Sequence, residues 1–131
     1  MQSNGQEVDH REIVLIADDD DNSAAFMVAV VRKLGYEAVW VTDGQIAFAR
    51  AKDLAPRLIM MDLMMPGFDG LTSIRLLRVS PATQNIPIVV VSGLDPATHA
   101  TKCREAGAAA FLAKPLTAEQ VRAALRDLGL S

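Results

Sequence analysis

Four consecutive aspartates, Asp18 to Asp21, separate two apolar stretches near the start of the 131-residue chain. Adjacent carboxylates repel one another and add nothing to apolar packing, so this cluster requires a positively charged partner. Further along the chain, Asp62, Ser92 and Lys114 each follow a short apolar run. Carboxylate oxygens suit a hard cation such as Mg²⁺, whereas a serine hydroxyl and a lysine ammonium suit phosphate oxygens. These residue types predict a site for magnesium and a phosphoryl group.

Asp62 is the candidate nucleophile of this site. A carboxylate can take a phosphoryl group as an acyl phosphate, and Asp62 directly follows the apolar run LIMM. Mg²⁺, Ser92 and Lys114 would neutralise the charge that develops during the transfer. Asp18 and Asp19 are the first residues after the apolar run at residues 13–17, so we predict them as metal ligands. Acids in the first turn of a helix favour its dipole, and this explains Asp20 and Asp21 without a metal.

The apolar runs have the pattern of buried parallel strands. Most are continuous rather than alternating, as expected for strands covered on both faces. We expect strands over residues 13–17, 38–41, 58–61, 86–91 and 109–113. Helical segments separate them, with stop signals such as Gly35 and Gly107, and we expect helices over residues 22–34, 44–53, 71–78, 96–106 and 117–128. Five such βα units predict an α/β fold with a doubly wound, five-stranded parallel sheet.

The predicted fold brings the candidate residues together. Ligands of open α/β sheets bind outside the carboxyl ends of the strands. The aspartate cluster follows the first expected strand, Asp62 the third and Ser92 the fourth, and Lys114 comes at the end of the fifth. We therefore expect the acids, the hydroxyl and the lysine to converge on one edge of the sheet.

Composition limits the class of protein. Half of the residues are apolar, and the net charge of −3 argues against binding to nucleic acid. The single cysteine, Cys103, excludes an internal disulfide framework and indicates a reducing, cytoplasmic location. No apolar stretch approaches the ~20 residues of a membrane span. We expect residues 1–11 to form a flexible tail and residues 12–131 a single domain.

Four segments in order resemble the receiver domain of two-component response regulators, and the match runs from Arg11 to the C-terminus. The segments are IVLIADDDD, LIMMDLMMPGFDGL, IVVVSG and GAAAFLAKPL. The resemblance, to single-domain, chemotaxis-regulator-like receivers, implies a flavodoxin-like (βα)5 fold with strand order 2-1-3-4-5. It also implies Mg²⁺ as cofactor and a phosphohistidine, on a histidine kinase or phosphotransfer protein, as phosphodonor. A downstream protein target would then bind the phosphorylated form. The protein itself is expected to be a monomer or weak dimer.

The resemblance assigns further roles. Asp62 would be the phosphoacceptor, the backbone carbonyl of Met64 a metal ligand, and Ser92 with Phe111 the switch pair. The bond between Lys114 and Pro115 would be cis. Ser92 replaces the threonine more common in the family, which keeps the hydroxyl and loses a methyl group.

The positions that tune phosphoryl lifetime in the family are Met64 and Leu94 here. Neither side chain can orient an attacking water molecule, so slow self-dephosphorylation is expected.

The first expected helix predicts a docking surface. Counting back from Leu34 at helical spacing predicts sheet-facing side chains at Val31, Val30, Met27, Phe26 and Ser23. The outward positions are then Ala24, Ala25, Val28, Ala29, Arg32 and Lys33. The apolar residues Ala25, Val28 and Ala29 would form an exposed patch beside the site, where phosphotransfer partners of the family dock.

Three other functions fit the sequence less well. The spacing of Asp18, Asp20 and Asn22 resembles a calcium loop, but Ser23 and Ala29 replace its glycine and glutamate. A magnesium phosphatase of the haloacid-dehalogenase type would need an acid two residues beyond its nucleophile. A degenerate receiver would lack part of the acid, hydroxyl and lysine set.

In a phosphatase of the haloacid-dehalogenase type, the acid two residues beyond the nucleophile would fall at Met64, and methionine cannot protonate a leaving group. No output domain is expected after the last helix, which leaves a stand-alone regulator or the receiver of a hybrid histidine kinase.

Overall fold

The computed structural model describes residues 12–130 of the chain, in which five strands and five helices alternate. The strands are β1 (Ile13–Ala17), β2 (Glu37–Val41), β3 (Leu58–Met61), β4 (Ile88–Ser92) and β5 (Ala110–Ala113). The helices are α1 (Asp21–Lys33), α2 (Gly44–Leu54), α3 (Gly70–Val79), α4 (Pro96–Ala106) and α5 (Ala118–Asp127). The expected alternation of strands and helices is confirmed. The flexible tail predicted for residues 1–11 lies outside the described residues.

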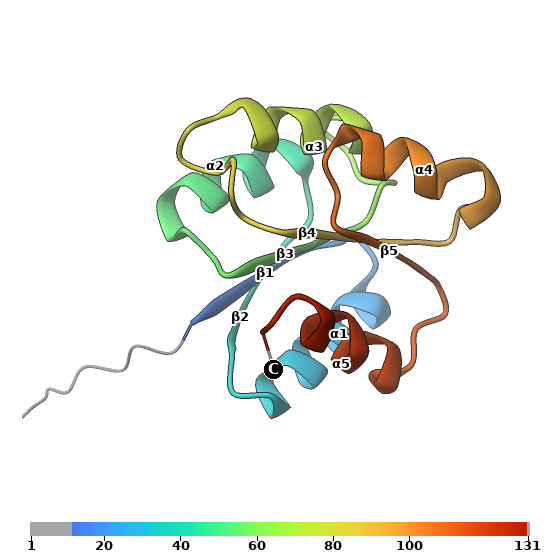
Figure 1. The fold of residues 1–131 in the computed structure, drawn as a ribbon. Coiled ribbons are helices and arrows are strands. Elements are labelled where there is room, and N and C mark those ends of the chain that lie inside the picture. Colours follow the sequence, from blue (N-terminus) through green and yellow to red (C-terminus); the bar gives the residue numbers. More distant parts are fainter. Residues whose placement is uncertain (1–11, 131) are drawn as a thin grey trace, which may run out of the picture.

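All five strands pair in parallel, in the order β2-β1-β3-β4-β5. Helices α1 and α5 cover one face of the sheet, and α2, α3 and α4 cover the other (Figure 1). This confirms the doubly wound, flavodoxin-like order 2-1-3-4-5 that the family resemblance implies. Within residues 12–130, no helix is both long and apolar enough to cross a membrane.

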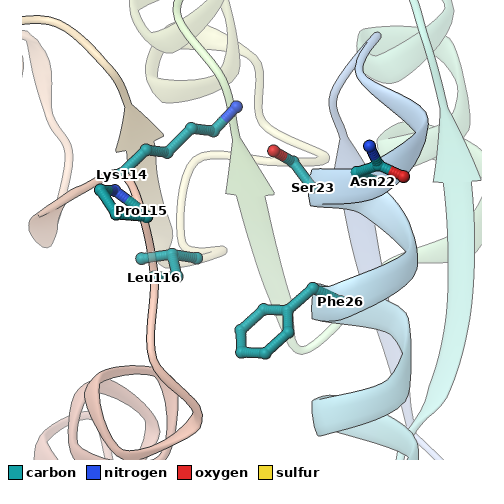
Figure 2. A pocket seen from close by; sticks show the side chains of 6 residues that line it. All are labelled: Asn22, Ser23, Phe26, Lys114, Pro115 and Leu116. Carbon is teal, nitrogen blue, oxygen red and sulfur yellow. The ribbon is translucent and has the colours of Figure 1, made fainter.

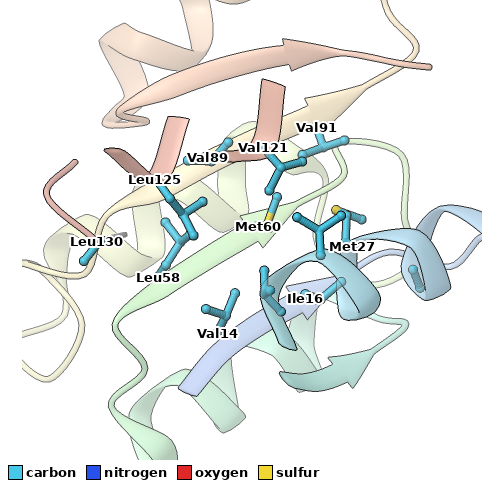
Figure 3. Close-up of a cluster of buried hydrophobic side chains, with 13 residues drawn as sticks. Val14, Ile16, Met27, Leu58, Met60, Val89, Val91, Val121, Leu125 and Leu130 are labelled. Atoms are coloured by element: carbon cyan, nitrogen blue, oxygen red, sulfur yellow. The ribbon is translucent and has the colours of Figure 1, made fainter. Parts of the chain in front are cut away.

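Each face of the sheet buries its own hydrophobic cluster. Successive strand residues alternate between the two clusters, so that Val14 and Ile16 face α1 and α5 whereas Leu15 and Ala17 face the other three helices. Figure 3 shows the first cluster, in which side chains from β1, β3 and β4 meet those of α1 and α5. Because the central strands are buried on both faces, their sequences are apolar without alternation.

Side-chain caps fix where the helices begin. The N-cap residues are Asp20, Asp43, Asp69, Asp95 and Thr117. Each accepts a hydrogen bond from a backbone amide that has no partner within the helix. Thr117 and Gln120 form the capping box that the sequence predicts.

The fourth strand differs from its predicted bounds. It begins at Ile88 rather than at residue 86 and extends to Ser92. The amide of Ile86 turns back to the carbonyl of Thr83 at 3.0 Å, and Pro87 has no N–H to donate to a neighbouring strand. The pairing with β3 therefore starts at the carbonyl of Pro87, which accepts from the amide of Ile59 at 3.0 Å, and Ile86 precedes the strand.

Candidate functional site

The carboxyl ends of the strands bring four of the candidate residues to one edge of the sheet. Asp18 and Asp62 directly follow β1 and β3, Ser92 is the last residue of β4, and Lys114 directly follows β5. Backbone hydrogen bonds continue the strand pairing into this edge. The amide of Asp62 donates to Ala17 and the amide of Lys114 donates to Ser92, each at 2.8 Å.

Lys114 connects the two acids. Its Nζ lies 3.0 Å from Oδ2 of Asp18 and 3.0 Å from Oδ2 of Asp62. Burial alone lowers the pKa of Lys114, but hydrogen bonds and charge from the two carboxylates outweigh burial and raise that pKa above its usual value. Lys114 is therefore a fixed positive charge between two acids.

Asp18 is fully buried and Asp62 is 6% exposed. Burial raises the pKa of Asp18 more than the hydrogen bonds from Asp20 and Lys114 lower it. The other oxygen of Asp62, Oδ1, accepts a hydrogen bond from the backbone amide of Met64 at 3.0 Å. Both oxygens of Asp62 are thus held in place, and the carboxylate is fixed at the edge of the sheet.

A third carboxylate, that of Asp19, completes an acidic cluster. One oxygen from each of Asp18, Asp19 and Asp62 lies within 4.8 Å of the others. Asp19 is exposed, so the cluster opens to solvent on its side. Three carboxylates beside the single ammonium of Lys114 leave an excess of two negative charges. This oxygen donor set and charge fit a divalent, hard cation such as Mg²⁺.

Asp20 and Asp21 lie outside this cluster. Asp20 caps α1, where its carboxylate accepts from the amide of Ser23 at 2.8 Å. Hydrogen bonds from Ser23 hold the pKa of Asp20 below its usual value. Asp21 is exposed in the first turn of the helix. The alternative explanation of these two acids, as helix N-terminal residues, is confirmed for Asp20.

The predicted switch residues occupy different environments. Ser92 is fully buried, and its Oγ accepts a hydrogen bond from the amide of Leu94 at 3.0 Å. Phe111 pairs with Val90 across β4 and β5, is half-buried, and packs against the cluster under α2, α3 and α4. The bond between Lys114 and Pro115 is cis, as the family resemblance implies.

The predicted face of α1 is wrong in part. Ala24, expected outside, is fully buried, and Phe26, expected inside, is 37% exposed. Val28, expected outside, is half-buried and packs against the cluster under α1 and α5. Ala25 and Ala29 are exposed as predicted. Counting back in steps of four drifts by about 40° per turn from the true helical period, which accounts for the error.

The exposed ring of Phe26 borders a pocket next to the site. The pocket has a volume of about 410 Å³ and lies between the start of α1 and the segment that joins β5 to α5. Its lining residues are Asn22, Ser23, Phe26, Lys114, Pro115 and Leu116. In Figure 2 the Phe26 ring points from α1 toward the segment that carries Leu116. Sequence reasoning missed this pocket because its lining comes from segments far apart in the chain.

Sequence reasoning also missed a contact that Trp40 makes beside the site. Its indole Nε1 donates to the backbone carbonyl of Asp18 over 2.6 Å. The two residues are 22 positions apart. No spacing in the sequence indicates a contact between a strand side chain and a loop carbonyl.

Residues 14–126 match the family described as "Response regulator receiver domain". The chain belongs to this family. Receiver domains are signalling modules rather than conventional enzymes, and a role in phosphorylation and signal transduction follows from membership.

Among curated relatives, this receiver domain is 35% identical over 115 residues to response regulator PleD of Caulobacter vibrioides. It is 30% identical over 116 residues to the DNA-binding response regulator MtrA of Mycolicibacterium smegmatis. Each alignment covers 88% of this chain, but only 25% of PleD and 50% of MtrA. The chain therefore spans a quarter of the length of PleD and half of the length of MtrA.

Solved receiver domains have the same fold. The receiver domain of the sensor histidine kinase PA1611 from Pseudomonas aeruginosa is 26% identical, with a TM-score of 0.81 and coverage of 91% of this chain and 98% of that one. Its structure has a magnesium ion coordinated in the active site cleft. The receiver domain of Francisella response regulator 1452 is also 26% identical, with a TM-score of 0.80 and coverage of 90% and 96%. Chemotaxis regulator CheY4 of Vibrio cholerae, 24% identical at a TM-score of 0.83, shares the fold over 90% of this chain and 98% of its own.

Proposed function

We propose that this receiver domain accepts a phosphoryl group on Asp62 from a phosphohistidine of a histidine kinase or phosphotransfer protein. One observation carries the proposal: the ammonium of Lys114 lies 3.0 Å from both the Asp62 and the Asp18 carboxylates. A lysine in this position can neutralise a phosphoryl oxygen on Asp62 while Asp18 keeps it in place.

In the proposed transfer, a carboxylate oxygen of Asp62 attacks phosphorus, and the bond between phosphorus and the imidazole nitrogen of the donor breaks. The imidazole leaves with the bonding electron pair and regains a proton from solvent. Lys114 and the Met64 amide already hold the two oxygens of Asp62, so the carboxylate is oriented before the donor arrives. The chain thus supplies orientation and positive charge for the transfer.

We propose that Asp18, Asp19 and Asp62 hold a Mg²⁺ ion, with the backbone carbonyl of Met64 as a further ligand. The support is the spacing of the three carboxylates and their two uncompensated negative charges. Bound Mg²⁺ supplies charge neutralisation for the phosphoryl oxygens. Titration with Mg²⁺ of the wild-type protein and of Asp19→Asn tests this site, since the variant is expected to bind much more weakly.

Ser92 and Phe111 are the proposed switch. The Ser92 hydroxyl ends β4 at the same edge as Asp62, and its oxygen has a single backbone donor at Leu94. A phosphoryl group on Asp62 offers this hydroxyl a new acceptor. Phe111 is half-buried, so an inward movement of its ring would bury further apolar surface and reshape the surface of β5 for a downstream protein target. Such a change requires two states that differ in their interaction with the phosphoryl group.

The proposed docking surface for the phosphodonor is corrected from the predicted one. Val28 packs inward and is removed from it, whereas Ala25 and Ala29 stay and Phe26 is added. Phe26 borders the pocket that reaches Lys114, so apolar surface is continuous with the reactive edge. An exposed apolar patch beside a reactive group suits contact with a protein partner.

A phosphatase of the haloacid-dehalogenase type has no support from the site. The residue two positions beyond Asp62 is Met64, whose side chain is 61% exposed and has no proton to donate.

Intact mass spectrometry after incubation with Mg²⁺ and acetyl phosphate tests the proposed function. Wild type is expected to gain the mass of one phosphoryl group, and Asp62→Asn is expected to gain none. Equal phosphorylation of the two proteins would contradict the assignment.

A further inference from the structure

We infer that Trp40 is a positioning residue for the cation site: its indole N–H holds the peptide that joins Asp18 to Asp19. The inference rests on the proposed magnesium site. Trp40 lies on β2, the edge strand next to β1, and is not itself a proposed ligand of the ion.

The contact lies just beyond the end of the β1–β2 ladder. Ile16 and Ala17 pair with Trp40 and Val41, and the amide of Asp18 still donates to the carbonyl of Val41 at 3.0 Å. The carbonyl of Asp18 lies past the last paired residue of β1. Trp40 reaches this carbonyl with its side chain and donates over 2.6 Å. The indole therefore adds one hydrogen bond between β2 and the loop beyond the last backbone pair of the two strands.

Asp18 is held at four of its polar atoms. Its amide donates to Val41, its carbonyl accepts from Trp40, Oδ1 accepts from the amide of Asp20, and Oδ2 accepts from Lys114. Three of these contacts fix the amide or the side chain of Asp18. Only the contact with Trp40 acts on the carbonyl, and that carbonyl belongs to the peptide unit leading to Asp19.

The orientation of this peptide decides where the Asp19 carboxylate lies. A peptide unit is planar, so a fixed carbonyl direction also fixes the direction of the Asp19 amide and the position of its Cα. The Asp19 side chain is exposed, and packing does not hold it. Loss of the indole donor would leave the Asp18 carbonyl without this partner, so that the peptide is less tightly oriented and the third carboxylate less ordered before the cation binds.

Apolar packing does not account for the choice of residue at this position. Trp40 is 43% exposed, although it lies on the same face of β2 as Ala38, which packs against the cluster under α1 and α5. A large exposed ring on an edge strand gains little from burial, whereas its N–H makes a short hydrogen bond at the reactive edge. The donor, rather than the ring, is the informative part of the side chain.

The chain allows a clean test because Trp40 is its only tryptophan. Replacement of tryptophan by benzothienylalanine exchanges the indole N–H for sulfur and keeps the shape of the ring. Trp40→Phe is the genetic counterpart. Ile46→Ala, at an exposed apolar residue of α2 that is 50% accessible, is the matched control. Calorimetric titration with Mg²⁺ measures the affinity, and the melting temperature without Mg²⁺ reports on the fold.

We expect both replacements of Trp40 to weaken Mg²⁺ binding by about threefold to tenfold, as for one lost hydrogen bond. We expect Ile46→Ala to bind like wild type. At saturating Mg²⁺, phosphorylation by acetyl phosphate should return to the wild-type rate, which a general loss of structure would not allow. Unchanged affinity of the benzothienyl protein would overturn the inference, even if Trp40→Phe binds weakly. A wild-type protein that binds no Mg²⁺ would instead refute the proposed cation site, and the inference with it.

Discussion

The ammonium nitrogen of Lys114 lies 3.0 Å from Oδ2 of Asp62, across a separation of 52 residues in the sequence. The same nitrogen contacts Asp18, so one lysine occupies the space between two carboxylates that would otherwise repel each other. This lysine has two opposing effects. It compensates the charge of the acids while they are unoccupied, and it competes with any cation that the acids attract.

Replacement of Lys114 by methionine separates these effects. Mg²⁺ is expected to bind more tightly to Lys114→Met, because a positive charge has been removed beside its ligands. Phosphorylation by acetyl phosphate at saturating Mg²⁺ is expected to slow roughly a hundredfold, because the phosphoryl oxygens lose a charged donor. Titration calorimetry and the rate of mass increase measure the two quantities. Weaker Mg²⁺ binding with an unchanged rate would reverse the proposed role of the lysine.

Substitutions at Ser73 and Thr83 are expected to change stability in opposite directions. Among residues 12–130, Ser73 Oγ is a buried side-chain oxygen without a hydrogen-bond partner, whereas the buried hydroxyl of Thr83 donates to the carbonyl of Leu77 at 2.7 Å. Ser73→Ala is expected to raise the free energy of unfolding by about 1 kcal/mol, and Thr83→Val to lower it by about 1 kcal/mol. Urea denaturation measures both, and a change of the same sign in the two variants would contradict the expectation.

The cap of α3 makes stability depend on pH. Hydrogen bonds from the side chain and then the amide of Thr72 hold the pKa of Asp69 below its usual 3.8. A lowered folded-state pKa contributes stability above the unfolded-state pKa, and this is lost as the pH falls through the folded value. Asp69→Ala is thus expected to melt at a lower temperature at pH 7, with a gap that narrows in acid. Asp69→Asn, which keeps an acceptor, should lie between them, and a gap independent of pH would contradict this.

The corrected docking surface is tested at Phe26. Phe26→Glu places a charge on the apolar border of the pocket beside Lys114. The ratio of the transfer rate from a phosphohistidine protein to the rate from acetyl phosphate is expected to fall by tenfold or more, since a buried charge is costly at an interface. Val79→Glu, at a residue of α3 that is 73% exposed on the other face of the sheet, should keep the wild-type ratio. An unchanged ratio in Phe26→Glu would place the donor elsewhere.

Local signals explain which parts of the fold were predictable. The strands are marked by continuous apolar runs, and Thr117 with Gln120 marks the start of α5 within four residues of sequence. The convergence of Asp18, Asp62 and Lys114 follows from the general position of ligands in α/β sheets. The strand order, however, came from the family resemblance, because pairing between strands leaves no trace in a single sequence.

The errors in the prediction have two sources: the phase of a helix along the chain and contacts between residues that are far apart in the sequence. The inner face of α1 was misplaced at Ala24 and Phe26 because a small error in helical phase grows with each turn. The contact between Trp40 and Asp18 joins two segments through a side chain, and no local pattern encodes it. The sequence of helices and strands along the chain is therefore easier to infer than the side-chain contacts between them.

The most direct test is the chemical location of the phosphoryl group. Borohydride reduces an aspartyl phosphate to homoserine, so peptide mapping of the protein after incubation with Mg²⁺ and acetyl phosphate identifies the modified residue. Homoserine is expected at position 62, with unmodified aspartate at Asp18 and Asp19. Homoserine at either of those two acids, or stable phosphate that resists reduction, would contradict the assignment of Asp62 as the phosphoacceptor.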